Sequence, residues 1–113
     1  YVHGVHDWAF RASEFWTKGG WWGIGEKDFA LAVSSSPVAD LSKWKAPVLL
    51  VSGDDDRNVM FQETTDLAER LKEKNVPVEV LVLPDEVHGF LRYESWRSIF
   101  NRSTAFFDRN LKP

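Results

Sequence analysis

The chain has 113 residues, 43% of them hydrophobic, which is enough for one domain with a single core. Its 14 basic and 17 acidic residues are interspersed, so we expect neither a nucleic-acid nor a membrane partner. The absence of cysteine excludes disulfides and thiolate chemistry. Because no signal peptide or membrane-spanning run is recognisable, we expect a soluble protein, with the cytoplasm slightly favoured.

The first part of the chain is rich in aromatic residues and glycines. The whole chain has six Trp and eight Phe, and the many that precede residue 25 suggest a surface that something else covers. Tyr1-Val2 is consistent with the end of a strand, and Asp7 can cap a short helix over residues 8–16. The glycines that follow lack the spacing of a phosphate-binding loop, so that function is not expected.

Residues 27–36 predict a short helix that ends in a run of serines. A serine nucleophile on a strand-to-helix elbow needs the motif Gly-x-Ser-x-Gly. None of the nine serines in this chain has those glycines. We therefore interpret the serine run as a helix end and turn, and residues 38–45 as a connector.

The centre of the chain predicts a strand, a helix and a second strand. The apolar run 47–52, which ends at Gly53, suits a parallel strand that is buried on both faces. A helix over 60–74 and a strand over 78–83 complete a unit of the kind that pairs its strands in parallel. Apolar residues with helical periodicity predict a closing helix over 94–111.

The carboxylates after the first strand could suggest a metal site, but their spacing does not match one. The pattern Asp-x-Asp-x-Asn at 54–58 matches the start of a calcium-binding loop. That loop needs Gly at its sixth position and Glu at its twelfth, where this chain has Val59 and Thr65. We expect no metal and no organic cofactor.

Asp56 and His88 are the predicted catalytic pair. Each follows the carboxyl end of one of the two strands, where the chemistry of open α/β sheets is found. An Asp there can accept a hydrogen bond from one imidazole nitrogen, which leaves the other nitrogen to take a proton from a serine. The order Asp then His is that of the second half of an α/β-hydrolase triad. Asp54 and Asp55 are interpreted as a solvated acidic turn.

Two motifs give the chain a family resemblance. The string Pro-Val-Leu-Leu-Val-Ser-Gly-Asp-Asp-Asp-Arg-Asn-Val at 47–59, Pro-Asp-Glu-Val-His-Gly-Phe at 84–90 and the closing aromatic helix resemble the C-terminal end of the prolyl oligopeptidase family. These are serine peptidases, among them dipeptidyl peptidases and acylaminoacyl peptidases. The resemblance covers residues 1–113 and implies an α/β fold, the C-terminal portion of an α/β-hydrolase peptidase domain. It also implies that Asp56 and His88 belong to a Ser-Asp-His triad.

The resemblance implies substrate-binding residues as well. Val5 and Trp8 match an apolar residue and a Trp that line the S1 pocket of dipeptidyl peptidases, and Phe15 matches a later aromatic position of that wall. Asn58 stands where family members bind a substrate carbonyl, and Val59 would lie beside the pocket. Core packing is the alternative for Trp8 and Phe15.

The resemblance also implies what must complete the enzyme. The serine, the oxyanion hole and an N-terminal β-propeller would all lie outside this chain, so we expect the chain alone to be inactive. It should hold the two outermost strands of an eight-stranded sheet and the stump of a third. The open edge would pair with the rest of the catalytic domain or with another copy, and the substrate would be a short peptide. An esterase-type α/β hydrolase and a non-catalytic association module remain the alternatives.

Overall fold

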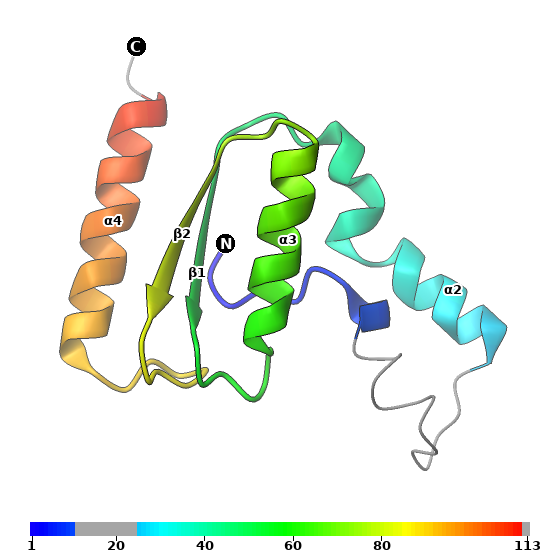
Figure 1. The fold of residues 1–113 in the computed structure, drawn as a ribbon, viewed down its shortest axis with the longest axis horizontal. Helices are drawn as coiled ribbons and strands as arrows, with labels where there is room; N and C mark the ends of the chain where they lie inside the picture. The colour runs from blue at the N-terminus through cyan, green and yellow to red at the C-terminus, as the bar shows by residue number, and fades with distance from the viewer. Residues whose placement is uncertain (11–24, 112–113) are drawn as a thin grey trace. The chain divides into compact units, whose positions relative to one another are not determined.

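The computed structural model describes residues 1–10 and 25–111 (Figure 1). The chain divides into two compact units, one formed by Tyr1–Gly4 with Lys45–Pro113 and the other by Val5–Trp44. The elements, in chain order, are helix α2 (Glu26–Ser34), 3-10 helix η1 (Pro37–Lys43), strand β1 (Val48–Gly53), helix α3 (Phe61–Glu73), strand β2 (Val78–Leu83) and helix α4 (Tyr93–Leu111). Among the described residues, no helix is long and apolar enough to cross a bilayer.

Strand β1 lies in the middle of the first unit. Strand β2 pairs with it in parallel, in a register that sets Val48 opposite Val78. On its other edge β1 forms a parallel bridge between Val51 and Val2, and the backbone nitrogen of Tyr1 donates to a β1 carbonyl at 3.0 Å. Five of the six β1 residues are buried. The predicted two-faced burial of this strand is confirmed. Tyr1-Val2, expected as the end of a strand, contributes an isolated parallel bridge at Val2.

Helices α3 and α4 cover opposite faces of this small sheet (Figure 1). On the α3 side, Leu67 and Leu71 are essentially inaccessible to solvent, and each such side chain contributes roughly 1.5–3 kcal/mol through its burial. The α4 side holds a continuous hydrophobic cluster. Its members are Leu49, Val51, Leu83, Phe90, Ile99 and Phe106, with Leu81 packed against them.

A residue with left-handed backbone geometry follows the C-terminal end of α3. Asn75 has φ 58°, and the next amide, that of Val76, donates to the carbonyl of Leu71 at 2.9 Å. Asn tolerates this conformation better than most residues because its short polar side chain can bond locally. The helix therefore stops where the chain must turn into β2.

The Val5–Trp44 unit begins with a capped helical turn. The side-chain oxygen Oδ1 of Asp7 accepts hydrogen bonds from the amides of Ala9 and Phe10, at 2.9 and 3.2 Å. Residues 8–10 are helical, and the rest of the predicted helix lies outside the described residues. The capping role of Asp7 is confirmed.

The serine run is a helix end, as predicted. Helix α2 stops at Ser34, and Ser36 is buried, where its hydroxyl donates to the carbonyl of Ala32 at 2.6 Å and accepts from the amide of Trp8 at 2.8 Å. The connector predicted at 38–45 is wrong, because η1 occupies most of it. A 3-10 turn has three residues per turn, so a search for the α-helical period does not detect it.

Candidate active site

Asp56 and His88 contact each other, as the sequence predicted. The Asp56 side chain is fully buried, and its Oδ2 lies 2.8 Å from Nδ1 of His88. Its other oxygen, Oδ1, accepts the backbone amides of Asn58 and Val59 at 2.9 Å each. Because both oxygens are engaged, the turn after β1 fixes the orientation of the carboxylate.

The imidazole of His88 has one edge toward Asp56 and is partly open to solvent. Its side chain is 36% exposed, and with Nδ1 at Asp56 the opposite nitrogen, Nε2, is the one left for a reacting group. An imidazole held in this way can take up a proton at Nε2 while the carboxylate stabilises the resulting positive charge. The pair therefore has the geometry of a general base and its orienting acid.

A second histidine lies against the pair. The ring of His3 stacks on that of His88 with centroids 4.2 Å apart, and on that of Phe90 at 4.8 Å. Burial and, to a smaller extent, the neighbouring His88 lower the pKa of His3, against the opposing effect of Asp56. Sequence reasoning missed His3, because a lone histidine far away in the chain has no spacing that ties it to His88.

Among the described residues, this trio is also the group that could hold a metal ion. Single ligand atoms of His3, Asp56 and His88 all lie within 4.8 Å of one another. However, the Asp56 carboxylate already receives two backbone amides and the imidazole. A cation bound between Oδ2 of Asp56 and Nδ1 of His88 would have to break their hydrogen bond, so these two atoms fit a hydrogen-bonded pair better than a resident metal site.

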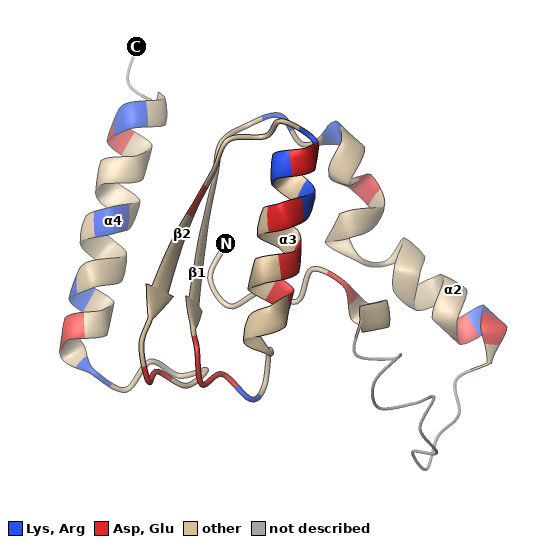
Figure 2. Cartoon of the chain, viewed as in Figure 1, with Lys and Arg blue, Asp and Glu red and all other residues tan. Residues whose placement is uncertain are grey.

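The two loops that carry Asp56 and His88 are bonded to each other. The amide of Asp55 donates to the carbonyl of Glu86 at 3.2 Å, and the amide of Asp85 donates to Oδ1 of Asp54 at 2.6 Å. Acidic residues gather in these turns beyond β1 and β2 (Figure 2). Asp54 and Asp55 are exposed as predicted, but the interpretation of Asp54 as merely solvated is wrong, because its carboxylate binds the other loop.

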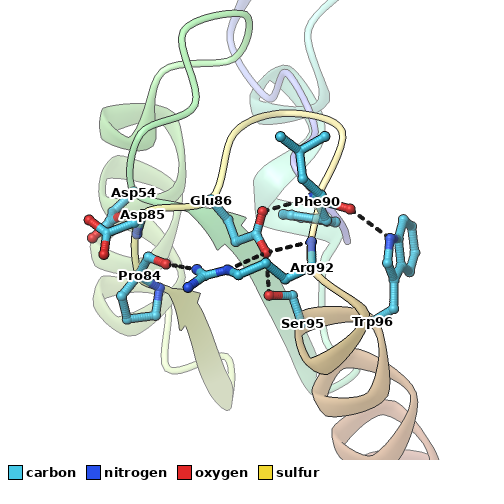
Figure 3. A network of polar contacts seen from close by, with 9 residues as sticks. Asp54, Pro84, Asp85, Glu86, Phe90, Arg92, Ser95 and Trp96 are labelled. Atoms are coloured by element: carbon cyan, nitrogen blue, oxygen red, sulfur yellow. Dashed lines mark hydrogen bonds and ion pairs between the residues drawn. The ribbon is translucent and has the colours of Figure 1, made fainter.

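Glu86 is a buried carboxylate two residues before His88. Figure 3 shows its polar contacts with Arg92 and Ser95. Glu86 is 1% exposed and accepts the amides of Leu91 and Arg92 at 2.8 and 3.1 Å, Nε of Arg92 at 2.9 Å, and the hydroxyl of Ser95. The Ser95 hydrogen bond, with those from Arg92 and the amides, lowers the pKa of Glu86 to about 2 against the effect of burial. Its position in the loop after β2 gave no reason to single out Glu86 from the sequence.

The expected substrate-binding residues fall into two groups. Asn58 is exposed and Val59 is buried, and both belong to the turn that holds Asp56. Val5 is half-buried and Trp8 is 53% exposed, and both belong to the other compact unit. Trp8 therefore does not pack in a core of the described residues, and Phe15 lies outside those residues.

The family model and the curated relatives that match this chain point to the same family. The model of the prolyl oligopeptidase family matches residues 1–113. The chain is 36% identical over 79 residues to the acylamino-acid-releasing enzyme of Mus musculus, which is 70% of this chain and 11% of that protein. It is 35% identical over 72 residues to dipeptidyl aminopeptidase BIII of Pseudoxanthomonas mexicana, which is 64% of this chain and 10% of that protein. The chain spans about a tenth of the length of these curated relatives.

Solved structures share the fold. Dipeptidyl peptidase 4 of Porphyromonas gingivalis superposes with a TM-score of 0.74 and 25% identity, covering 96% of this chain and 15% of that one. A puromycin-hydrolyzing peptidase of Mycobacterium tuberculosis superposes with a TM-score of 0.74 and 23% identity, covering 97% of this chain and 18% of that one.

Proposed function

Because this chain belongs to the prolyl oligopeptidase family, we propose that it supplies the acid and the histidine of the catalytic triad of a serine peptidase. Its strands and flanking helices have the α/β-hydrolase fold. In this proposal, residues 1–113 are the C-terminal portion of the catalytic domain. The nucleophile serine, the oxyanion hole and a β-propeller lie elsewhere in the full-length protein that contains this chain.

The observation that carries the proposal is the contact between Asp56 and His88. The buried carboxylate, held by two backbone amides, meets Nδ1 of the imidazole at 2.8 Å. This contact selects the tautomer in which Nε2 is free to accept a proton. A surface ion pair would need neither the burial of the acid nor the amides that orient it.

The proposed reaction proceeds through an acyl-enzyme. His88 takes the proton of the serine hydroxyl as the serine oxygen bonds to the substrate carbonyl, and then gives that proton to the departing amine as the C–N bond breaks. Water repeats the sequence: His88 takes its proton, the acyl group passes to the water oxygen, and the serine leaves with the proton. Asp56 stays ionised throughout and stabilises the imidazolium.

The substrate class follows from the relatives. Their names describe acylamino-acid release and dipeptidyl aminopeptidase activity, so we propose short peptides or peptide N-termini as substrates. Val5, Trp8, Phe15 and Asn58 are the proposed contacts, with Val59 beside the pocket. The sheet edge beyond Tyr1–His3 is the proposed docking edge for the remaining strands of the catalytic domain or for another copy of the chain.

The test uses the full-length protein and a panel of chromogenic substrates. The panel contains a free-amine dipeptidyl anilide, an acetyl-aminoacyl anilide and a nitrophenyl ester. The Asp56→Asn variant should lower kcat by about 10⁴-fold because the imidazole loses the partner that fixes its tautomer. His88→Ala should lose at least as much, since it removes the base itself. Residues 1–113 alone should hydrolyse nothing.

Asp55→Asn is the matched control. Asp55 is the neighbouring carboxylate, exposed and paired with Arg57, so its replacement should leave kcat within about twofold. Ester cleavage without anilide cleavage would support the esterase alternative instead. If Asp56→Asn and His88→Ala both fold and keep full activity, the proposed catalytic roles are wrong. The chain would then be a non-catalytic association module.

A further inference from the structure

We propose that Glu86 is a positioning residue, whose buried carboxylate holds the turn that presents His88 to Asp56. The proposal deepens the proposed function and rests on it. It assigns a measurable share of the catalytic rate to a carboxylate whose hydrogen bonds go to the start of α4.

The first support is the attachment of Glu86 to the start of α4. Its carboxylate accepts the amides of Leu91 and Arg92 just before the helix and the hydroxyl of Ser95 in its first turn. These are donors at a helix N-terminus, where a negative charge is favoured by the helix dipole. The turn from 86 to 92, which contains His88, is thereby closed into a loop with both ends tied to one carboxylate (Figure 3).

The second support is Arg92, which extends the same anchor. Its Nε donates to Glu86, and its terminal nitrogen donates to the carbonyl of Pro84 (Figure 3). Trp96 adds a bond from its indole nitrogen to the carbonyl of Phe90 at 2.8 Å. Arg92, which directly precedes α4, and Trp96 of α4 therefore hold the backbone on both sides of His88.

The third support lies on the other side of Glu86, where its carbonyl accepts the amide of Asp55 at 3.2 Å. The same residue thus bonds the acid-bearing loop through its backbone and the helix through its side chain. Because Asp55 directly precedes Asp56, this bond, together with the one from the amide of Asp85 to Asp54, holds the loops of the two proposed catalytic groups together. A displacement near 1 Å is enough to reduce a rate by about 100-fold.

The main variant is Glu86→Gln in the full-length protein. A Gln keeps the size of the side chain, but it offers a single acceptor oxygen and an NH₂ group that faces donors. The number of active sites is first titrated with an irreversible fluorophosphonate, and kcat is expressed per titrated site. We expect kcat per site to fall by about 100-fold while KM stays within about twofold.

Active-site titration separates positioning from folding. A role limited to stability would reduce the number of titrated sites and leave kcat per site unchanged. Glu79→Gln is the matched control, because Glu79 also pairs with arginines, Arg102 and Arg109, but lies on β2 away from the His88 turn. It should retain the parental kcat per site.

Two further variants dissect the anchor. Ser95→Ala removes one donor to Glu86, and Arg92→Met removes the Nε donor to Glu86 together with the bond to the Pro84 carbonyl. Each should lower kcat per site by about 5- to 20-fold, less than Glu86→Gln. In the Glu86→Gln background the same changes should cost little more, because residues that share one network are not additive.

Amide hydrogen exchange provides a readout that does not need activity. In Glu86→Gln, the amides of Leu91 and Arg92 should exchange at least tenfold faster than in the parent and in Glu79→Gln. Unchanged exchange, or unchanged kcat per site in a folded Glu86→Gln, overturns the proposal. An inactive parent protein would refute the proposed function instead, while the exchange measurement would still decide whether Glu86 anchors the turn.

Discussion

Gly53 lies directly against the backbone of Glu86. A Cβ built on Gly53 would be 2.1 Å from the carbonyl oxygen of Glu86 and 2.7 Å from its carbonyl carbon. No real Cβ approaches backbone so closely, so the end of β1 and the start of the His88 turn can meet only because this residue is glycine.

Gly53→Ala should therefore destabilise the protein and separate the two loops. We expect a loss of about 1–3 kcal/mol in the free energy of unfolding, as for other forced overpacking. The measurement is denaturant unfolding of the catalytic domain, together with kcat. Gly89→Ala is the control, because its Cβ would meet nothing within 4 Å and should change stability by no more than about 0.5 kcal/mol. Equal behaviour of the two variants would contradict this account.

The hydrogen bonds of Glu86 predict an acid-dependent stability. Its pKa falls from the usual 4.5 to about 2 on folding, so its stabilisation is complete above pH 4.5. It is lost as pH falls from 4.5 through about 2, where the folded state must also take up the proton. The thermal midpoints of the parent and of Glu86→Gln should therefore converge as the pH falls below 4.5. A constant difference across that range would show that the charge is not what stabilises the turn.

The lowered pKa of His3 predicts that the stability of the fold also depends on pH in a higher range. Its pKa is lowered from 6.5 in the folded state, so below pH 6.5 the unfolded chain takes up a proton more readily than the folded one. The free energy of unfolding should therefore decrease as the pH is lowered below 6.5. His3→Phe keeps an aromatic ring against His88 and Phe90 but cannot titrate, so thermal midpoints measured from about pH 7.5 to about pH 5.5 should show a shallower slope. An identical slope in the variant would refute the assignment to His3.

The left-handed backbone of Asn75 predicts that replacement by Gly and by Ala will change the stability by different amounts. Its φ of 58° suits glycine better than any residue with a branched or bulky side chain. Asn75→Gly should leave stability within about 0.5 kcal/mol, and Asn75→Ala should cost about 1 kcal/mol. Denaturant unfolding of both variants at one pH tests the claim. A more stable Ala variant would mean that helix propensity outweighs the left-handed geometry here.

The sequence predicted those parts of the structure that follow from local pattern. The run that forms β1 is apolar on both faces, and the periodicity of α3 and α4 is strong, so their bounds were predicted to within two residues. The contact between Asp56 and His88 was predictable because parallel strands bring their carboxyl ends to one edge.

The remaining features depend on the tertiary structure. Nothing local distinguishes Glu86, whose carboxylate is buried, from the exposed Asp85 beside it. The available signal was weak: an acid followed by Arg92 and Ser95 at the start of a helix, which is where helix-capping acids occur. His3 reaches the site only because residues 1–3 bond to the far edge of β1.

The pairing of β1 on both edges has a consequence for the order in which the chain folds. Strands β1 and β2 join through α3 within a continuous stretch from Val48 to Leu83, whereas Tyr1 bonds to Leu49 across 48 residues. Closing the longer loop costs more chain entropy and gains only a few backbone bonds. We therefore expect the β1–α3–β2 unit to form first and residues 1–3 to join it last. The imidazole of His3 would then reach His88 only in the final step of folding.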